Sequence, residues 1–548
     1  MWILLRLQRA KKEAVKLNIQ AEFNSSRSLG ENIADGFSKR AKKIIYLRLK
    51  LQNMSEFRKI LIANRGEIAL RIIRSVQEMG KKAIAVYSEV DLHSPHAKKA
   101  DEAYCIGAAP ASKSYLDIEK IIAVAKKAKA DAIHPGYGFL SENSLFAKAV
   151  KEAGMVFIGP SEHSIQLMGD KISSKQAVAE FNVPLLPGSA EAIDDIKTGI
   201  ELAEKIGYPV LIKASAGGGG KGMRIVYKHE EFKDQMERAV SEAKSAFGDG
   251  RVFLEKYIVN PKHIEFQILR DNHGNTVHVF ERECSIQRRY QKVIEEAPSM
   301  VLTEDLRNEM GLAAVNTAIS CDYSGAGTVE FIFDQDRNFY FLEMNTRLQV
   351  EHPVSEMISG LDLVKEQISI AEGKKLSFKQ QDLTINGHAL EIRVYAEDPL
   401  DNFMPDTGKL TKYRIPSGPG VRVDDGYEED MEVSVYYDPM IAKLVVHAPN
   451  RNEAIERMLR AIKEYEITGV KTSLGFCEFV LKHEDFKNGS FTTAFVENNW
   501  SPEKITDEDS NEMFAALIAA FDLNTTSQQK TVHEKVVHEN NWLKNRKR

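Results

Sequence analysis

Apolar runs and amphipathic stretches alternate along the chain from residue 59 onward, at the spacing expected of strands and helices. Residues 60–63 form an apolar run directly after Lys59, a turn containing Gly66 follows, and apolar side chains then recur at helical spacing. The alternation continues with predicted strands at 82–87, 130–134 and 155–159 and predicted helices at 115–127 and 144–153. Strands and helices in this order predict a parallel, doubly wound α/β domain.

A glycine-rich loop marks the next region, beyond a predicted helix at 161–180 and a Pro/Gly boundary at 183–188. Residues 217–220 are four consecutive glycines between two predicted strands, which costs chain entropy unless the backbone must approach a ligand closely. Backbone N–H groups of such a loop can surround a polyphosphate, and Lys213 and Lys221 supply positive charge nearby. The spacing is not that of a P-loop, and a flexible hairpin tip is the alternative.

Residues 328–334 and the start of the stretch 339–353 are both rich in aromatic and β-branched residues, and a short polar segment at 335–338 joins them, which predicts a β-hairpin. If its strands pair symmetrically, Glu330 lies opposite Glu343, and the period of two places Asn345 on the same face. Like charges that face each other destabilise a sheet, so a Mg²⁺ or Mn²⁺ ion between them is the functional interpretation. Two exposed glutamates on a hydrated sheet face are the alternative.

The segment after this hairpin adds further polar chemistry within a few residues. Arg347 provides an anion clamp, Gln349 an amide, and Glu351 and His352 a possible base. These residues come directly after Glu343, the proposed metal ligand, and this position favours a metal site over two exposed glutamates on the hairpin.

Three more stretches contain candidate ligand residues. The Gly/Pro loop at 134–142 follows a strand end, where open α/β sheets place ligands, although an ordinary strand-to-helix turn is equally open. Arg288, Arg289 and Lys292 form a basic cluster, interpreted either as an anion site or as a solvated face. Arg393 lies on a largely apolar strand and is predicted to point into a cleft or an ion pair.

The C-terminal part changes character after a predicted amphipathic helix at 356–371 and a polar connector at 374–386. From residue 387 strands predominate, with helices at 451–465 and 474–481, which predicts an α+β domain.

The two ends of the chain differ from the rest. Residues 1–53 are rich in Lys and Arg and resemble either a transit-like leader or sequence translated upstream of a start at Met54, of which we favour the second. The tail at 501–548 is acidic and then polar, and is expected to be mostly mobile.

Length, charge and cysteine content limit the classes of function that this chain can have. A length of 548 residues predicts three or four domains, and a net charge of −5 with a pI near 6.3 argues against a nucleic-acid partner. Four scattered cysteines fit neither a disulfide framework nor a zinc site, and indicate free thiols in a reducing compartment. No apolar run approaches the length of a membrane span, so no membrane association is expected.

The glycine loop, the lysine before it and the paired carboxylates of the later hairpin together resemble an ATP-grasp enzyme. The run Arg-x-Gln-Val-Glu-His-Pro at 347–353 narrows the resemblance to biotin carboxylase, over approximately residues 57–500. Supporting motifs are Ala-Asn-Arg-Gly-Glu-Ile-Ala at 63–69, His-Pro-Gly-Tyr-Gly-Phe at 134–139, Met-Gly-Asp-Lys at 168–171 and Gln-Arg-Arg at 287–289. The segments 393–399 and 436–440 are similar to the propionyl-type acyl-CoA carboxylase branch.

The resemblance implies an α/β and α+β multidomain protein. Its expected parts are an N-terminal parallel α/β (pre-ATP-grasp) domain at 54–168, an ATP-grasp domain at 169–386 with a glycine-loop lid at about 185–257, and a C-terminal α+β domain at 387–500.

The resemblance also implies roles for individual residues. ATP phosphates are expected at Lys171, Lys213, Gly219 and Gly220, the adenosine at Glu255, Lys256, Tyr257, Ile258 and His263, and two Mg²⁺ or Mn²⁺ ions at Glu330, Glu343 and Asn345. Bicarbonate and the carboxyphosphate made from it are expected at Lys292, Arg347, Gln349 and the Val350 backbone, with Glu351 as base and Arg393 at the ureido oxygen of biotin. Tyr290 stands where a histidine near the nucleotide is frequent, and that role is not assigned to it.

The expected function is the first half-reaction of an acetyl-CoA or propionyl-CoA carboxylase, in the cytoplasm, or in the mitochondrial matrix if 1–53 is a transit peptide. The chain contains no Met-Lys dipeptide, the usual surroundings of the biotinyl lysine, so a separate biotin carboxyl carrier protein and carboxyltransferase are the expected partners. A homodimer is a family expectation. The alternatives are another ATP-grasp ligase, of purine-pathway or carbamoyl-phosphate type, and a nucleotide-sensing regulator that lacks the chemistry.

Overall fold

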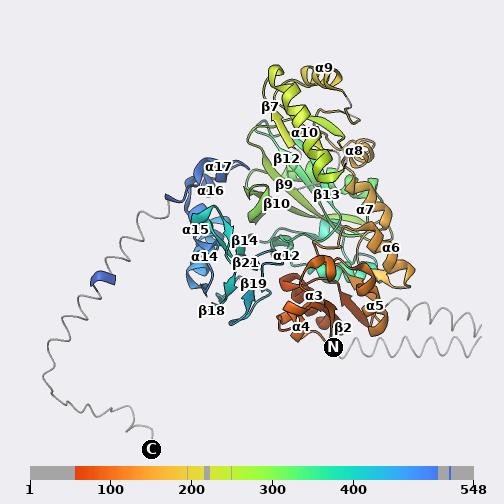
Figure 1. Cartoon of the computed structure of the whole chain (residues 1–548), viewed down its shortest axis with the longest axis vertical. Helices are drawn as coiled ribbons and strands as arrows, with labels where there is room; N and C mark the ends of the chain where they lie inside the picture. The colour runs from red at the N-terminus through yellow and green to blue at the C-terminus, as the bar shows by residue number, and fades with distance from the viewer. Residues whose placement is uncertain are drawn as a thin grey trace, which may run out of the picture.

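The computed structural model describes residues 56–189, 191–193, 195–214, 223–248, 250–503 and 517–519. The predicted extension at 1–53, the four glycines at 217–220 and most of the tail at 501–548 lie outside the described residues. Figure 1 shows the red and orange N-terminal part at one end of a large central sheet and a small yellow-green unit at the other end. No helix in the described part of the chain is long and apolar enough to cross a membrane.

The N-terminal part is built on a five-stranded parallel sheet in the order β3-β2-β1-β4-β5. Ile60, Leu61 and Ile62 in the central strand are fully buried, which explains the continuous apolar run there. The strands are β1 (Lys59–Ile62), β2 (Lys82–Ser88), β3 (Glu102–Gly107), β4 (Ala132–His134) and β5 (Val156–Phe157); the helices are α3 (Gly66–Glu78), α4 (Pro95–Lys99), α5 (Ile118–Ala128) and α6 (Ser144–Glu152). The predicted parallel α/β domain is confirmed.

The central sheet has eight strands in the order β13-β12-β9-β10-β11-β14-β21-β19, and every neighbouring pair is antiparallel. The sheet contains strands from both sides of residue 386, so the expected boundary between the ATP-grasp and C-terminal domains falls between strands of one sheet. The strands are β9 (Lys262–Arg270), β10 (Thr276–Arg288), β11 (Gln291–Ala297), β12 (Gly325–Phe333), β13 (Phe339–Asn345), β14 (His388–Tyr395), β19 (Val421–Asp425) and β21 (Met440–Ala448). The helices around it are α7 (Glu162–Gly169), α8 (Lys171–Ala179), α11 (Glu304–Ser320), α12 (His352–Ser359) and α13 (Leu363–Ala371).

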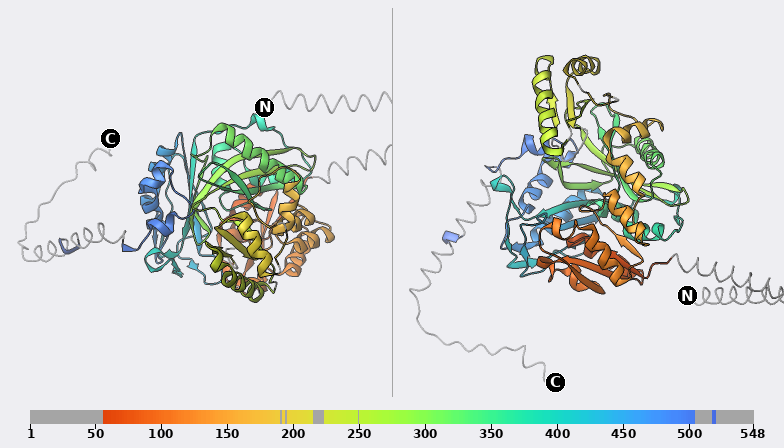
Figure 2. Two further views of the ribbon diagram at one scale, coloured as in Figure 1. Left: turned by 90° about the horizontal axis from the view of Figure 1, so that it is seen from above. Right: turned by 45° about the vertical axis from the view of Figure 1, so that its right-hand side comes forward.

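A small unit projects from this body, as the right view of Figure 2 shows. It consists of a three-stranded antiparallel sheet, β7-β6-β8, with two helices packed against it. Its elements are β6 (Val210–Ala214), β7 (Met223–Val226), β8 (Val252–Lys256), α9 (Ile196–Ile206) and α10 (Phe232–Phe247). The residues between β6 and β7, which include the glycine run, are outside the described part.

The C-terminal part packs helices on the far end of the eight-stranded sheet, as predicted for an α+β region. The helices are α14 (Arg451–Glu464), α15 (Leu474–Lys482), α16 (Glu484–Asn488) and α17 (Phe495–Asn499). Short strands form three two-stranded pairs: β15 (Glu397–Asp398) with β16 (Met404–Pro405), β17 (Gly408–Lys409) with β20 (Glu432–Val433), and β18 (Lys412–Arg414) with β22 (Glu466–Thr468).

Two predicted helices are each divided in the structure. The helix expected at 161–180 breaks at Asp170, whose side chain accepts a hydrogen bond from the Ser173 N–H and so begins α8. The helix expected at 356–371 ends at Gly360, which has a φ of +74° and caps α12 in the left-handed conformation.

Candidate active site

The predicted hairpin is formed by β12 and β13, and Glu330 pairs directly with Glu343, as the sequence indicated. The register near the turn is displaced by one residue, because Phe331 pairs with Phe341. Leu342 is therefore an extra residue on β13, and this β-bulge restores the predicted pairing at Glu343. The bulge turns both Leu342 and Glu343 toward a cavity, while Phe341 is buried in the core.

A cavity of about 430 Å³ lies over this hairpin and collects residues from distant parts of the sequence. Of the residues that the sequence proposed, it is lined by Lys171, Lys213, Glu255, His263, Lys292, Glu330, Glu343, Asn345, Arg347, Gln349, Val350, Glu351 and Arg393. The proposed nucleotide, metal and bicarbonate residues thus surround one space.

A few proposed residues lie elsewhere. Lys256 donates from Nζ to the carbonyl oxygens of Gly207 and Tyr208, at 2.8 and 3.0 Å. Tyr257 borders a neighbouring cavity of about 350 Å³, and Ile258 lines neither space. Gly219 and Gly220 lie outside the described residues.

Lys292 is the cation at the centre of the cavity wall. Its Nζ lies 2.8 Å from Glu330 Oε1 and 2.7 Å from Glu351 Oε1, and it also contacts Glu265. Burial alone would lower the pKa of Lys292, but the three carboxylates raise it well above its ordinary value. Lys292 therefore stays protonated and joins the hairpin carboxylate to the proposed base.

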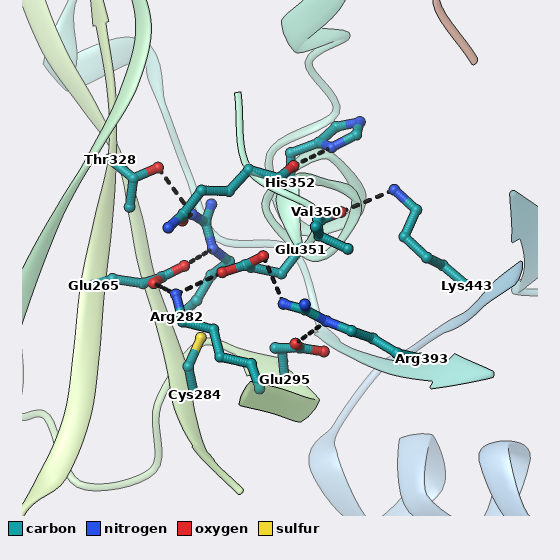
Figure 3. A network of polar contacts seen from close by, with 12 residues as sticks. Glu265, Arg282, Cys284, Glu295, Thr328, Val350, Glu351, His352, Arg393 and Lys443 are labelled. Atoms are coloured by element: carbon teal, nitrogen blue, oxygen red, sulfur yellow. Dashed lines mark hydrogen bonds and ion pairs between the residues drawn. The ribbon is translucent and has the colours of Figure 1, made fainter. Parts of the chain in front are cut away.

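Glu351 is held on its other side by Arg393, whose Nη2 donates to Glu351 Oε2 at 2.9 Å (Figure 3). Arg393 Nε donates to Glu295 Oε1 at 2.7 Å, which fixes the guanidinium at the cavity wall. Burial raises the pKa of Glu351, but Lys292 and Arg393 outweigh it and the pKa falls below its usual range. Glu351 is thus a carboxylate near neutral pH and can accept a proton.

The two hairpin carboxylates are in different electrostatic states. Burial would raise the pKa of Glu330, yet Lys292 and His263 hold it well below its usual range, whereas burial and then Glu330 raise the pKa of Glu343. The carboxylate of Glu343 makes no hydrogen bond or ion pair with any residue that the structure describes. An oxygen-preferring divalent cation would satisfy this carboxylate, so the residues present fit the proposed metal.

His263 lies against the hairpin carboxylates, with Nε2 3.3 Å from Glu330 Oε2 and 3.5 Å from Glu265 Oε2. Burial alone would lower the pKa of His263, but Glu330 raises it to about 9. On its other side, the His263 Nδ1 lies 3.1 Å from Gln287 Nε2. The ring thus contacts the carboxylates through Nε2 and Gln287 through Nδ1, and a role around the adenosine stays a prediction.

Arg347 is anchored by the loop that follows β4. Its Nε donates to Glu142 Oε2 at 2.9 Å, and its Nη2 donates to Asn345 Oδ1 at 3.1 Å. The same loop places Tyr137 in a second cavity of about 510 Å³, which shares Arg347 and Arg393 with the first. The loop at 134–142 is therefore part of the site wall.

The predicted basic cluster is dispersed in the structure. Only Lys292 enters the site; Arg288 pairs with Glu397 at 2.7 Å, and Arg289 donates to Asn402 at 3.0 Å. The turn between β10 and β11 separates the side chains, so the three cations do not form a single anion site.

Several site residues were missed by the sequence analysis. Arg282, which is fully buried, binds Glu265 and Gln349; Glu295 binds Arg393; and Lys175 contacts Glu255, to which the proposed Lys213 also binds. The alternating pattern of β9 around Glu265 could have revealed its strand. No local signal showed that the charged run at 281–283 is buried.

Three family models match the chain: "Biotin carboxylase, N-terminal domain" at residues 56–165, "Carbamoyl-phosphate synthase L chain, ATP binding domain" at 170–379, and "Biotin carboxylase C-terminal domain" at 391–498. Biotin carboxylase 2 of Bacillus subtilis is 52% identical over 443 residues, covering 81% of this chain and 100% of that protein. A biotin carboxylase of Halalkalibacterium halodurans is 51% identical over 443 residues, covering 81% and 98%. The human mitochondrial propionyl-CoA carboxylase alpha chain is 48% identical over 501 residues, covering 89% and 69%.

Solved structures of biotin carboxylases are also similar to this chain. A biotin carboxylase–βγ-ATP complex from Campylobacter jejuni has a TM-score of 0.79 at 48% identity, and covers 82% of this chain and 100% of that one. The biotin carboxylase domain dimer of Hydrogenobacter thermophilus 2-oxoglutarate carboxylase, solved with MgADP, ADP and bicarbonate, has a TM-score of 0.79 at 48% identity and covers 82% and 99%. The expected three-part fold is confirmed by these similarities.

Proposed function

The chain belongs to the biotin carboxylase family, and from this premise we propose that it uses ATP and bicarbonate to carboxylate biotin by way of carboxyphosphate. The observation that carries this proposal is the position of Lys292. It binds Glu330, on the side proposed for ATP and metal, and Glu351, on the side proposed for bicarbonate. The proposed ATP and metal site and the proposed bicarbonate site therefore lie along one cavity wall.

ATP and the divalent ion are assigned to the hairpin side of the cavity. Glu330, Glu343 and Asn345 would hold two Mg²⁺ or Mn²⁺ ions, and Lys171 and Lys213 would bind the phosphates. Bound metal would supply positive charge that neutralises the charge developing on the phosphates. The carboxylate of Glu343, which has no hydrogen-bond or ion-pair partner among the described residues and whose pKa burial and Glu330 raise, supports this assignment.

Bicarbonate is assigned to the space between Arg347, Gln349 and the Val350 backbone. In this proposal Glu351 removes the proton of bicarbonate, which then attacks the terminal phosphate of ATP to form carboxyphosphate with release of ADP. Lys292 then holds the carboxyphosphate. The lowered pKa of Glu351 keeps its carboxylate deprotonated near neutral pH and so free to accept that proton.

Biotin is assigned to the second cavity, at the point where both cavities share Arg393. The guanidinium of Arg393 would stabilise negative charge on the ureido oxygen as N1′ is carboxylated. A fixed donor aimed at that oxygen needs no reorganisation, and the ion pair between Arg393 and Glu295 supplies that rigidity.

Other ATP-grasp ligases remain the enzymatic alternative, since the middle segment matches a carbamoyl-phosphate synthase ATP-binding model. The matches to biotin carboxylase models on both sides of it favour biotin as the acceptor. A nucleotide-sensing regulator without chemistry is disfavoured by the connected set of Lys292, Glu351 and Arg393.

The proposed partners are a separate biotin carboxyl carrier protein and a carboxyltransferase, with this chain as a homodimer. The related domain from Hydrogenobacter thermophilus is described as a dimer, which supports the last point. Acetyl-CoA or propionyl-CoA is the proposed final acceptor, and the cytoplasm the proposed location.

The test measures phosphate release from ATP, Mg²⁺ and bicarbonate, with and without free biotin. Wild-type protein should need bicarbonate and be stimulated by biotin, and Glu351→Gln should lose that stimulation because its amide cannot accept the proton. Glu372→Gln is a matched control, since Glu372 is a buried carboxylate bound to Lys81 away from both cavities. Turnover indifferent to biotin, or an active Glu351→Gln, would refute the proposal.

A further inference from the structure

The backbone at 349–351, which lines the catalytic cavity, has two successive carbonyl oxygens held by buried side chains. His352 Nδ1 lies 2.8 Å from the Gln349 carbonyl oxygen, and Lys443 Nζ donates to the Val350 carbonyl oxygen at 2.8 Å. Figure 3 shows His352 and Lys443 approaching this segment from the side away from the Glu351 carboxylate.

Holding these carbonyls also sets the direction of the adjoining N–H groups. A trans peptide group is planar, and its C=O and N–H bonds point in opposite directions. The Val350 N–H must therefore point away from the donor on the Gln349 carbonyl, and the Glu351 N–H away from Lys443. Among the residues that the structure describes, neither N–H donates a hydrogen bond. Two adjacent N–H groups that face a cavity form a backbone site for an anion.

Lys443 is buried without any exposed side-chain surface, although it carries a charge. It extends from β21 and lies 3.4 Å from Glu67 Oε2 and 3.9 Å from Asp424 Oδ2. A buried ammonium loses several kcal/mol of hydration unless it is compensated. Its shortest polar contact within the described chain is the hydrogen bond to the Val350 carbonyl, so the buried side chain supports this loop as well as pairing with Glu67 and Asp424.

His352 provides the second support. It is fully buried, and burial, followed by the charge of Lys443, lowers its pKa well below the usual value. The neutral ring must carry its proton on Nδ1, because the Gln349 carbonyl oxygen can only accept. Its Nε2 has no hydrogen-bond partner among the described residues, so the one hydrogen bond of the ring is made to the loop.

We propose that Lys443 and His352 are positioning residues, which aim the N–H groups of Val350 and Glu351 at the reacting anion. The inference rests on the proposed function for the identity of that anion, bicarbonate or the carboxyphosphate made from it. Neither side chain touches the anion itself. Their loss should weaken anion binding and leave ATP binding, at Lys171 and Lys213, unchanged.

The experiment measures the KM for bicarbonate and the KM for ATP from phosphate release in full-length protein. Lys443→Met keeps the length and burial of the side chain but removes its donor, and should raise the KM for bicarbonate by about tenfold or more. The KM for ATP should stay within about twofold of wild type. Lys81→Met is the matched control, because the largely buried Lys81 donates to the Phe57 carbonyl at 3.0 Å and pairs with Glu372 at 2.6 Å, remote from both cavities.

A second pair of variants applies even if Lys443→Met fails to fold. His352→Leu removes the donor and should raise the KM for bicarbonate, whereas His352→Asn retains a donor near the position of Nδ1 and should restore it. Equal KM values for bicarbonate in these two variants, or an unchanged KM in Lys443→Met, would overturn the inference alone. Wild-type turnover that does not depend on bicarbonate would refute the proposed function and the inference together.

Discussion

Replacing Arg282 by methionine is expected to reduce both stability and bicarbonate binding, because one buried guanidinium supports two parts of the site. Arg282 has no exposed surface, and each of its N–H groups has a partner. It donates to Glu265 at 2.5 Å, Gln267 at 2.8 Å, Ser355 and Thr328 at 3.0 Å, and Gln349 at 2.6 Å.

The expected loss of stability follows from these contacts. Removing one partner of a buried ion pair costs about 3–5 kcal/mol, and the lower part of that range applies because Glu265 keeps its contact with Lys292. The described chain is roughly 440 residues, so the entropy of unfolding is ~0.9 kcal/mol/K if it unfolds as one unit. A loss of ~3–4 kcal/mol therefore lowers Tm by about 3–4 °C.

The expected kinetic effect comes from Gln349, which loses the donor on its Oε1. The KM for bicarbonate should rise by about tenfold, the order of one charged hydrogen bond. Arg282→Lys separates the effect on stability from the effect on bicarbonate binding. A lysine ammonium can keep the positive charge beside Glu265, but it cannot reach all the hydrogen-bond partners of the planar guanidinium group. That variant should recover most of the Tm and little of the bicarbonate affinity.

Calorimetry and phosphate-release kinetics measure the two quantities in the same preparation. Arg307→Met is the control: it breaks a largely buried ion pair to Glu281 on the neighbouring position of β10, at 2.8 Å, and should lower Tm without changing the KM for bicarbonate. A Tm of Arg282→Met equal to wild type, or a bicarbonate KM no different from that of Arg307→Met, would refute the reasoning.

Three further changes give equally direct tests. Glu343→Gln should raise the Mg²⁺ concentration needed for half-maximal turnover, because the hairpin loses an anionic ligand; an unchanged metal titration would contradict the hairpin assignment. Arg393→Met should move the acid limb of the kcat/KM profile for bicarbonate to higher pH, since it removes one of the cations that, against the effect of burial, lower the pKa of Glu351; an unmoved limb would contradict Glu351 as the base. Glu142→Gln should raise the KM for bicarbonate several-fold by loosening Arg347, and an unchanged value would show that Glu142 does not hold it.

The hairpin was predictable because its signal is local. Both strands and their turn lie within about twenty residues, so pairing Glu330 with Glu343 required only strand periodicity and a short polar connection. The bulge at Leu342 was not visible, because the one-residue offset at the turn and the bulge compensate each other at Glu343.

Strand β10, two positions from β12 in the same sheet, was less predictable, because burial there contradicts residue type. Glu281, Arg282 and Glu283 are consecutive charged residues and resemble a surface segment in sequence, yet all three are buried. An irregularity near Phe280, which has a φ of +59°, also shifts the strand's register. Only partners brought from other elements, such as Gln349, make these charges compatible with the interior.

The eight-stranded sheet has a consequence for how the protein is made. The hairpin of β10 and β11 can form early on the ribosome, but the free edge of β11 is covered only when β14 has been synthesised, and the site is complete only after β21 delivers Lys443. At about 5–20 residues per second, the roughly 100 residues from the end of β11 to the end of β14 take on the order of 5–20 seconds. Throughout that interval Glu295 and Glu296 place charge on the waiting edge, which discourages pairing with a neighbouring nascent chain. Glu295 and Glu296 thus keep the incomplete sheet from pairing wrongly, and in the complete sheet they form ion pairs with Arg393 and Arg451.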